Sequence, residues 1–407
     1  MKKRFVIVGA GFRCYHMFAK TIRDRFSDRC EIVGVCDPNY ERAQIYIDTI
    51  NKDMKYYEDF DKMLEELKPD AALVTTPDGY HHKYIIKALN AGVDVYTEKP
   101  LTTTRENCAA IREAEKKSGK KVTITFNCRF IPFFVELKQL VDSGIIGTPL
   151  SINYDYHLPY THGGDYFKRW HRFMEMSGGM LVHKSTHHFD VANWILKDDP
   201  ESVIAQGNRV YYGNDDRPHG ERCLQCQYKD TCTSFDWLED DKDDIQLLYF
   251  GPEKVDGYQR DHCVFKPDTD IYDNMSVSVK YSRGAILTYT LHMFSPTEGF
   301  RINITGTKGR IEMNSHFDFN SKNPYEEFLV YLDDKSIQTI KFPKANGMHS
   351  GGDDRMLDMF FADRPDPLGQ CSTSYDGIKS AMIGIAANES IKTGKRIELT
   401  EFLKSMK

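Results

Sequence analysis

The sequence lacks long apolar runs, an excess of positive charge, internal repeats and low-complexity tracts. No run approaches the roughly 20 apolar residues that a helix needs to cross a bilayer, so we expect no membrane partner. The formal net charge of -6 leaves no basic patch for nucleic acid, which argues against that class of partner. With 40% hydrophobic and 28% charged residues, the composition is typical of an ordinary globular protein.

The start of the chain also lacks a complete export signal. Basic residues precede the short apolar run 5–8, as in a signal peptide, but Gly9, Gly11 and Arg13 interrupt the run and no small-residue cleavage site follows. Five cysteines occupy expected core or helix positions, which is typical of reduced cysteines in a cytosolic enzyme. They are Cys14, Cys30, Cys36, Cys108 and Cys128. We therefore expect a cytoplasmic protein.

The length of 407 residues predicts two domains, because one hydrophobic core rarely serves so long a chain. Residues 1–128 alternate short apolar runs with helical patterns, which predicts a Rossmann domain with a doubly wound parallel sheet. The expected strands span 4–8, 31–36, 71–75, 94–97 and 122–126. The expected fold class is therefore α/β.

From residue 129 onward the pattern changes and predicts a second α/β domain, 129–407, with an open and mainly antiparallel sheet. Helices are expected at 132–143, 183–196, 353–363 and 376–393. Strands are expected at 150–157, 203–212, 275–281, 286–294, 300–305 and 309–314. A polar, cysteine-bearing insertion occupies about 213–263.

A glycine-rich turn follows the first expected strand and predicts a dinucleotide site. Gly9 permits the tight bend, and Gly11 lets the backbone approach phosphate oxygens at the start of the next helix, beside Phe12 and Arg13. The third position of the fingerprint is Cys14 rather than glycine or alanine, which is a departure. The alternative is a strand–turn–helix unit that binds no nucleotide.

Asp37 ends the second expected strand and bears on the choice of cofactor. A carboxylate at this position accepts hydrogen bonds from the hydroxyls of the adenosine ribose and repels a 2′-phosphate. Pro38 and Asn39 follow, with no immediate arginine to bind that phosphate. NAD is therefore favoured over NADP.

Two later strand ends carry further candidates. The segment 75–77, followed by His81, suits a loop over the nicotinamide half of the cofactor, although a plain turn fits this composition almost equally well. Lys99, between Glu98 and Pro100, lies at the tip of another strand and would face the crevice where such folds bind ligand. The alternative for Lys99 is a structural ion pair with a neighbouring carboxylate.

Taken together, these segments resemble the Gfo/Idh/MocA family of NAD(P)-dependent sugar and inositol oxidoreductases over nearly the whole chain. The motifs that carry the resemblance are Gly9-Ala10-Gly11, Thr76-Pro77 with His81, Glu98-Lys99-Pro100, Asn127-x-Arg129, Ser177-Gly178-Gly179-x-Leu181 through His187-x-x-Asp190, and Gly306-x-x-Gly309. The Glu-Lys-Pro and the Gly-Gly…His-x-x-Asp segments are the specific ones.

The resemblance implies that Lys99 hydrogen-bonds the reacting hydroxyl and that His187 receives the hydroxyl proton as hydride leaves. Such a reaction requires a base near physiological pH and a cation that stabilises developing alkoxide charge. With the glycine turn, the resemblance also indicates the residues that bind the cofactor. They are Gly9, Gly11, Phe12, Arg13, Asp37, Thr75, Thr76, Pro77, His81, Glu98, Lys99 and Asn127.

One departure concerns His183, which stands where the family commonly has an acidic residue, four positions before His187. An i, i+4 spacing places both imidazoles on one helix face, so either could be the base. With Asp190 the pair could also form a zinc site, although the glutamate of the usual zinc motif is missing. His188 is expected on another face, as a packing or surface residue.

Substrate contacts are expected from aromatic and hydrogen-bonding side chains, which bind the C–H faces and the hydroxyls of sugars. Besides Lys99, His183 and His187, the candidates are Arg129, Tyr160, Trp170, His171 and Arg172. An ordinary surface loop of the same composition is the alternative for these residues.

Four cysteines, Cys223, Cys226, Cys232 and Cys263, have spacings that suit metal ligands. The first two have the Cys-x2-Cys spacing that lets two thiolates share a tetrahedral zinc ion, and the others could complete a closed structural site. His219 or His262 could replace one of the thiolates. The alternatives are four reduced cysteines in a loop or a redox-prone pair.

The sequence therefore predicts an NAD-dependent oxidoreductase that acts on a secondary hydroxyl of a sugar or cyclitol. One rival is a glycosidase or lyase that holds NAD tightly and recycles it. Another rival is a non-catalytic, NAD-binding regulatory protein. The resemblance also implies a homodimer or homotetramer that associates through the open sheet face.

Overall fold

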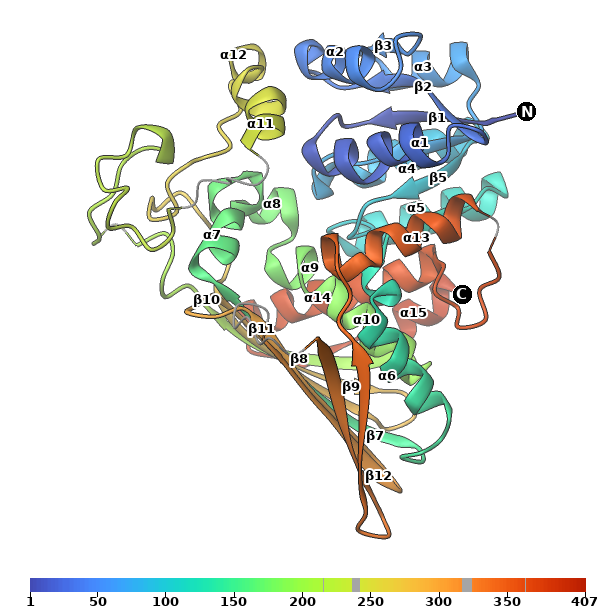
Figure 1. The fold of residues 1–407 in the computed structure, drawn as a ribbon, viewed down its shortest axis with the longest axis vertical. Coiled ribbons are helices and arrows are strands. Elements are labelled where there is room, and N and C mark those ends of the chain that lie inside the picture. The colour runs from blue at the N-terminus through green and yellow to red at the C-terminus, as the bar shows by residue number, and fades with distance from the viewer. Residues whose placement is uncertain (215, 236–241, 317–323, 363) are drawn as a thin grey trace. The chain divides into compact units, whose positions relative to one another are not determined.

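The computed structural model describes residues 1–214, 216–235, 242–316, 324–362 and 364–407. The chain forms two compact units (Figure 1). Unit 1 comprises residues 1–125, 236–262 and 354–378, and unit 2 comprises 126–235, 263–353 and 379–407. The domain boundary expected from the sequence lies between residues 128 and 129, which assigns residues 236–262 and 354–378 to the second domain. The structure instead groups these segments with unit 1, because a short strand and several ion pairs attach them there.

Unit 1 is built on a seven-stranded sheet in the order β15-β6-β5-β4-β1-β2-β3. Its strands are β1 (Lys3–Val8), β2 (Cys30–Cys36), β3 (Lys55–Tyr57), β4 (Ala71–Val74), β5 (Asp94–Thr97), β6 (Val122–Ile124) and β15 (Ser372–Thr373). All neighbours pair in parallel except β15 and β6. Strand β4 is buried throughout, as central strands of a parallel sheet are. The predicted doubly wound parallel sheet is confirmed.

Helices connect the strands of unit 1. They are η1 (Cys14–Lys20), α1 (Thr21–Arg25), α2 (Tyr40–Thr49), α3 (Phe60–Leu67), η2 (Asp78–Tyr80), α4 (His81–Asn90), α5 (Arg105–Ser118), α11 (Lys242–Ile245), η6 (Gln246–Phe250), α12 (Glu253–Asp256) and most of α13 (Gly352–Phe361). The side chains of Asn39 and Asp59 begin α2 and α3 by accepting hydrogen bonds from free backbone N–H groups. Strand β3 was not expected, because three residues carry no periodicity.

Unit 2 is built on a nine-stranded sheet in the order β14-β13-β12-β11-β7-β10-β9-β8-β16. Its strands are β7 (Pro149–Pro159), β8 (Pro200–Asn208), β9 (Asn274–Tyr281), β10 (Ile286–Ser295), β11 (Gly299–Gly306), β12 (Gly309–His316), β13 (Tyr325–Leu332), β14 (Ile337–Pro343) and β16 (Ile397–Glu398). Strands β7 and β10 pair in parallel and the other neighbours pair antiparallel. The predicted, mainly antiparallel sheet is confirmed, although β13 and β14 were not expected.

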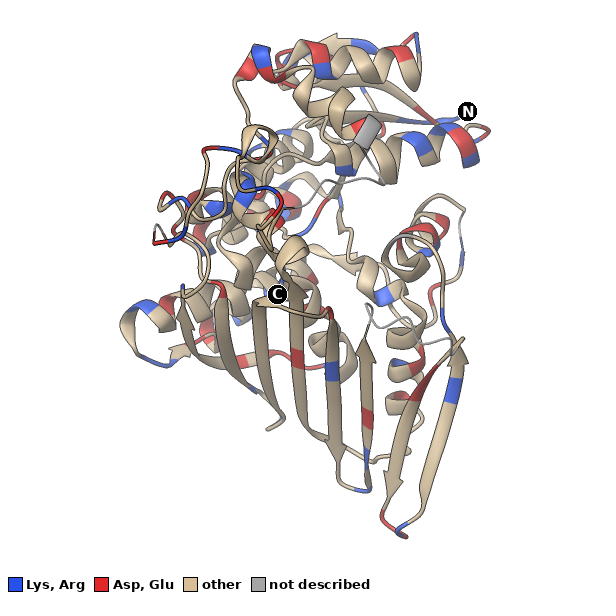
Figure 2. Ribbon diagram, turned by 60° about the vertical axis from the view of Figure 1, so that its left-hand side comes forward, with Lys and Arg blue, Asp and Glu red and all other residues tan. Residues whose placement is uncertain are grey.

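One face of this sheet is covered and the other is open. Along β10 exposed residues alternate with buried ones, beginning with Ile286 and Leu287, so the two faces differ in burial. Acidic and basic positions are interspersed along the strands of unit 2 (Figure 2). The open face carries both apolar and charged side chains, among them Ile286, Lys280 and Arg301.

The helices of unit 2 supply most of its candidate residues. They are η3 (Asn127–Phe130), α6 (Pro132–Asp142), α7 (Tyr160–Lys168), η4 (Trp170–Arg172), α8 (Met174–Ser177), α9 (Met180–His183), α10 (Thr186–Leu196), η5 (Cys223–Gln225), η7 (Met348–Gly351), most of α14 (Ser374–Thr393) and α15 (Thr400–Met406). The single helix expected at 183–196 is instead two helices, α9 and α10. They separate at Lys184 and Ser185, where the Ser185 N–H donates five residues back, to Met180, and interrupts the regular pattern.

The ranges that the structure describes hold no helix of the length and apolar character that a membrane crossing requires.

Candidate active site

The glycine-rich turn of unit 1 has the conformation that the fingerprint requires. Gly9 has φ +92°, and a Cβ at this position would lie 2.7 Å from the backbone nitrogen of Thr76. The Thr75 hydroxyl donates to the carbonyl oxygen of Gly9 at 2.7 Å, which presses the turn against the end of β4. Only glycine fits this approach. The turn brings the N–H groups that follow it to the start of η1, where the N–H of Phe12 donates to the hydroxyl of Tyr249 at 2.9 Å.

Cys14, the departure from the fingerprint, is a packed core thiol. It is fully buried, and burial raises its pKa to about 12. The Tyr46 hydroxyl donates to the carbonyl oxygen of Gly11 at 2.8 Å and supports the turn from the other side. A small buried side chain at the third position thus preserves the close packing for which glycine or alanine is usually present.

Asp37 lies at the end of β2, beside the glycine turn. Its carboxylate accepts hydrogen bonds from the N–H of Ala10 at 2.7 Å and from the N–H of Asn39 at 2.8 Å. Burial raises the pKa of Asp37, while Arg42 and these N–H groups act to lower it. The glycine turn, its N–H groups and this carboxylate fit the phosphate and ribose parts of a dinucleotide.

Arg42 is a residue of this site that the sequence pattern did not indicate. Its Nη1 lies 3.2 Å from Asp37, and its Nη2 lies 2.9 Å from Asp256. Arg42 is five residues after Asp37, in the first turn of α2. The side chain of Asn39 caps this helix by accepting a hydrogen bond from the backbone N–H of Arg42, so that Arg42 lies near the end of β2. The helix-capping signal at Asn39 could have revealed it.

Glu98 and Lys99 lie at the tip of β5, as expected. The Glu98 carboxylate accepts from Arg13 Nε at 3.0 Å and from the backbone N–H of Lys99 at 3.2 Å. Glu98 thereby links the strand tip to the start of η1. The Lys99–Pro100 peptide bond is cis. The structure brings Arg13, Glu98 and Lys99 together in unit 1.

His81 connects two loops of unit 1. Its Nδ1 lies 2.8 Å from the carbonyl oxygen of Pro100, and its Nε2 lies 2.8 Å from the carbonyl oxygen of Thr76. Burial lowers the pKa of His81. The imidazole therefore holds the 75–77 segment against the strand tip that carries Lys99, which is a positioning task for both loops.

In unit 2, a buried cluster of histidine and aromatic rings surrounds His183. The rings of Trp170 and His171 stack with centroids 3.6 Å apart, and the His171 ring meets the His183 ring edge-on at 4.3 Å. Tyr166 contacts both imidazoles, with its ring centroid 5.4 Å from each. His171 and His183 are only 4% and 6% exposed. The structure thus brings together three of the residues expected to contact the substrate, Trp170, His171 and His183, and this role stays a prediction.

Four polar residues extend this cluster, and the sequence pattern did not indicate them. His162 Nδ1 lies 3.0 Å from Glu298, and the Tyr156 hydroxyl donates to the same carboxylate. The Lys184 ammonium lies 5.4 Å from the centre of the Tyr156 ring. Burial acts to raise the pKa of Glu298, but the contact with His162 and the charge of Lys184 bring it below its ordinary value. Glu298 and His162 are 136 residues apart, so no local pattern could reveal the pair.

His187 and His188 have different surroundings on α10. His187 is 9% exposed and packs edge-on against Phe126, with ring centroids 6.1 Å apart. His188 is 3% exposed, and its Nδ1 lies 2.7 Å from the hydroxyl of Tyr289. His188 is therefore a packing residue of the covered sheet face.

Arg129 forms a closed ion pair rather than an open binding group. Its Nε donates to Asp190 Oδ2 and its Nη2 donates to Asp190 Oδ1, each at 2.7 Å. Arg129 is 2% exposed and Asp190 is 0% exposed. Asn127 is also buried, and its Nδ2 donates to Asp353 at 2.8 Å. These contacts give both residues a structural task within unit 2.

Tyr160 and Arg172 lie at the borders of the histidine cluster's segment. The Tyr160 ring packs at 5.2 Å against Tyr211. The Arg172 guanidinium lies 4.4 Å from the centre of the Phe173 ring and 3.6 Å from Asp268. The structure thus gives each of them a neighbour outside the cluster.

The cysteine prediction is not supported. All ten cysteines are free thiols, and within the part of the chain that the structure describes no three His, Cys, Asp or Glu side chains have the arrangement of a metal site. Burial raises the pKa of Cys263, and the nearby Cys226 and Cys232 raise it further. Cys226 and Cys232 are thus close enough to Cys263 to affect its pKa, but the described residues include no group of three with the arrangement of a metal site. The same finding applies to the zinc reading of His183, His187 and Asp190.

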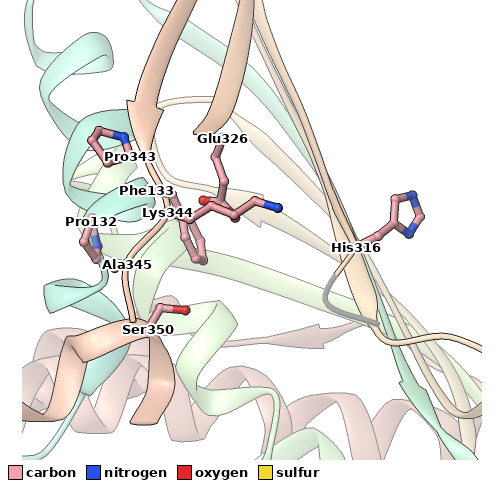
Figure 3. A pocket seen from close by; sticks show the side chains of 8 residues that line it. All are labelled: Pro132, Phe133, His316, Glu326, Pro343, Lys344, Ala345 and Ser350. Atoms are coloured by element: carbon pink, nitrogen blue, oxygen red, sulfur yellow. The ribbon is translucent and has the colours of Figure 1, made fainter. Parts of the chain in front are cut away.

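A cavity of about 120 Å³ lies elsewhere in unit 2 (Figure 3). Phe133, Glu326 and Lys344 are among the residues that line it. None of the expected site residues lines this cavity, so it is separate from the histidine cluster.

Both the N-terminal and the C-terminal part of the chain match models of one known protein family. Residues 3–126 match the family model of the Gfo/Idh/MocA oxidoreductases for the NAD-binding Rossmann fold. Residues 138–399 match the model for the C-terminal α/β domain of the same family. The two matches together span most of the sequence.

Three similar proteins illustrate the relationship. YteT from Bacillus subtilis (strain 168), which carries the name of an oxidoreductase, is 36% identical over 96% of this chain and 95% of its own length. Inositol 2-dehydrogenase from Salmonella typhimurium is 32% identical over 45% of this chain and half of its own length. The crystal structure of the WlbA dehydrogenase from Bordetella pertussis in complex with NADH and UDP-GlcNAcA has a TM-score of 0.67 at 19% identity and covers 98% of this chain and 99% of that chain. At that identity the structural similarity shows the fold alone.

Proposed function

This chain belongs to the Gfo/Idh/MocA family of oxidoreductases, and we propose that it oxidises a secondary hydroxyl of a sugar or cyclitol with NAD, or catalyses the reverse reaction. The observation that carries the proposal is the buried cluster of His171, His183, Trp170 and Tyr166 in unit 2. It combines imidazoles that can accept a proton with apolar ring surface that suits a carbohydrate. The similarity to inositol 2-dehydrogenase supports a polyol as the substrate class.

The proposed reaction divides the work among a few residues. An imidazole, that of His183 or His187, accepts the proton of the substrate hydroxyl. The Lys99 ammonium hydrogen-bonds the same oxygen and stabilises the negative charge that develops on it. The glycine turn and Asp37 would hold NAD, which when bound would supply the acceptor for the hydride of the adjoining carbon. The substrate carbon becomes a carbonyl carbon.

The polar extension of the cluster would recognise other hydroxyls of the substrate. Glu298 accepts hydrogen bonds, whereas Lys184 and Tyr166 donate them. Against the effect of burial, the contact with His162 and the charge of Lys184 lower the pKa of Glu298, which favours the ionised carboxylate as a hydrogen-bond acceptor. A sugar or cyclitol offers such hydroxyls in number, whereas a simple alcohol does not.

The preference for NAD over NADP rests on Asp37. Arg42, which lies beside that carboxylate, is paired with Asp37 through Nη1 at 3.2 Å. Its charge therefore offsets the Asp37 carboxylate rather than attracting a 2′-phosphate. We expect weaker binding of NADP than of NAD in equilibrium titrations, and equal dissociation constants would overturn this preference.

The central experiment compares Lys99→Ala with the wild-type chain. Purified protein is incubated with NAD and a panel of inositols and hexoses, and NADH formation is followed by absorbance. We expect kcat to fall by roughly 10²- to 10³-fold in the variant, since one stabilising group at the reacting oxygen is lost. The dissociation constant of NAD should stay within about twofold of wild type.

Lys117→Ala serves as the control, because Lys117 is an exposed lysine on α5 of the same unit. It should match the wild type in both measurements. Unchanged turnover in Lys99→Ala would overturn the catalytic proposal and favour an NAD-binding regulatory protein.

Native mass spectrometry of freshly purified protein tests two further expectations. NAD that stays bound through purification would favour a glycosidase or lyase that recycles it, whereas its absence favours a dehydrogenase that exchanges NAD. We also expect a homodimer or homotetramer. Ile204 and Ile286 support this, since they lie on the open sheet face and are 49% and 46% exposed. A monomer at micromolar concentration would contradict it.

A further inference from the structure

A segment far along the chain lies on the glycine-rich turn of unit 1. We define the strap as residues 242–258, which contain α11, η6 and α12. The strap belongs to unit 1 although more than a hundred residues of unit 2 precede it. Its contacts fall on the turn itself and on the structures at either side of the turn.

The central contact involves Tyr249. Its hydroxyl oxygen accepts a hydrogen bond from the backbone N–H of Phe12 at 2.9 Å. The same oxygen lies 3.3 Å from the position that a Cβ on Gly11 would occupy. In a turn of this kind, the N–H groups after the second glycine are the donors for the pyrophosphate of a dinucleotide. Tyr249 thus places an oxygen where a phosphate oxygen would be.

Two arginines hold the ring of Tyr249. The guanidinium groups of Arg42 and Arg260 each lie 5.5 Å from the ring centre. Arg42 also donates through Nε to the carbonyl oxygen of Leu248 at 3.0 Å and through Nη2 to Asp256 at 2.9 Å. The arginine that reaches the ribose-binding Asp37 is therefore the one that anchors the strap.

Further contacts fasten the strap on both sides of the ring. Asn39 Nδ2 donates to the carbonyl oxygen of Pro252 at 3.0 Å. Lys20 Nζ and His16 Nε2 both lie 2.8 Å from the carboxylate of Asp244. The strap thus spans from η1, across the turn, to the start of α2. These are the three elements that a dinucleotide contacts in a Rossmann fold.

We propose that the strap is a competitor of the cofactor: the Tyr249 hydroxyl satisfies the pyrophosphate-binding N–H of Phe12 when no cofactor is bound, and it must leave before a dinucleotide binds. The inference rests on one part of the proposed function, namely that the cofactor is a dinucleotide. The strap supplies a hydrogen-bond acceptor to this N–H in the free protein. Because the strap has to be released before the cofactor binds, the free energy of that release reduces the apparent affinity for the cofactor.

The first test is equilibrium binding of NAD and of ADP-ribose to the full-length wild type and to Tyr249→Phe. Removing the hydroxyl removes one hydrogen bond from the closed strap, so both ligands should bind about fivefold more tightly. Tyr331→Phe, in unit 2, is the matched control and should bind as the wild type does. Weaker or unchanged binding by Tyr249→Phe would overturn the proposal, because the tyrosine would then assist the cofactor or be irrelevant to it.

The second test uses the wild type alone, so it does not depend on the folding of a variant. Hydrogen exchange of the amides in 242–258 is compared with and without saturating NAD. The proposal requires faster exchange when NAD is present, since the strap is displaced. Slower or equal exchange would overturn it. If neither chain binds NAD or ADP-ribose, it is the proposed function that fails, and the two failures remain distinguishable.

Discussion

In unit 1 the groups that we propose to bind a dinucleotide are largely main-chain groups: the bend at Gly9, the N–H of Phe12 and the N–H groups that position Asp37. In unit 2 the groups that we propose to act on the substrate are side chains, and they come from α7, η4, α9 and the segment that carries Glu298. Main-chain donors have positions set by a few consecutive residues. Side-chain clusters depend on packing between distant segments. The two halves should therefore respond differently to substitution.

The two units also protect their reactive groups differently. In unit 1 the strap supplies polar partners to the glycine turn and to Arg42. In unit 2 His171 and His183 are covered by the rings of Trp170 and Tyr166. Polar partners can be exchanged for a ligand at small cost, whereas ring packing keeps a base in place through the reaction.

The largest expected effect separates the two histidines of unit 2. His183→Gln and His187→Gln are compared for kcat and for the dissociation constant of NAD. The variant that removes the base should lose roughly 10²- to 10⁴-fold in kcat, and the other should lose about tenfold or less. NAD affinity should be unchanged in both, since neither residue belongs to unit 1. Equal small losses would show that the base lies elsewhere.

The next effect concerns the buried ion pair of unit 2. Arg129→Met leaves the Asp190 carboxylate buried without its partner, so the free energy of unfolding should fall by about 3 to 5 kcal/mol. Arg310→Met, which removes an exposed pair with Glu312, should cost about 1 kcal/mol or less. Urea denaturation measures both. If Arg129→Met had unchanged stability and a raised KM, Arg129 would instead be a substrate-binding residue.

A moderate effect tests the main-chain half of the site. Gly9→Ala should abolish binding of NAD and lower the free energy of unfolding by roughly 1 to 3 kcal/mol, because φ +92° and the 2.7 Å approach to Thr76 both oppose a Cβ. Gly119→Ala is the control: its φ is +68°, but nothing lies within 4 Å of the added Cβ. It should bind NAD normally. If Gly9→Ala bound NAD as the wild type does, the glycine turn would not be part of the cofactor site.

The smallest effect is the pH dependence of Glu298. Because the folded protein lowers the pKa of Glu298, its ionised form contributes stability above the ordinary glutamate pKa of about 4.3. That contribution is lost as the pH falls through the lower pKa of the folded state. Glu298→Gln should therefore be less stable than wild type by on the order of 1 kcal/mol at pH 7, and the difference should shrink toward pH 3. A constant difference would contradict the ion pair with His162.

Local patterns allowed much of unit 1 to be predicted. Alternating strands and helices indicated the parallel sheet, and the glycine turn with Asp37 and Lys99 stood at the expected strand ends. Arg42 and Tyr249 could not be predicted in the same way. Arg42 depends on the cap at Asn39, and Tyr249 reaches Phe12 across 237 residues of sequence.

Unit 2 was less predictable from its residues. Trp170, His171 and His183 were each expected to contact the substrate, a role that stays a prediction, and the structure places their rings side by side. The zinc prediction is not supported in the described part of the chain, where no three ligand side chains are grouped as a metal site requires. Strands β13 and β14 carry too weak an alternation to be identified before their pairing with β12 is known.

The sequence by itself determined most of the order of strands and helices in unit 1, the glycine that the turn requires and the family to which the chain belongs, because each depends on residues that are adjacent or regularly spaced. Tertiary structure alone decided that Arg129 pairs with Asp190, that Glu298 joins His162, and that the strap lies on the cofactor turn. These contacts join residues 61, 136 and 237 positions apart. Their formation depends on the packing of whole elements, which no local spacing records.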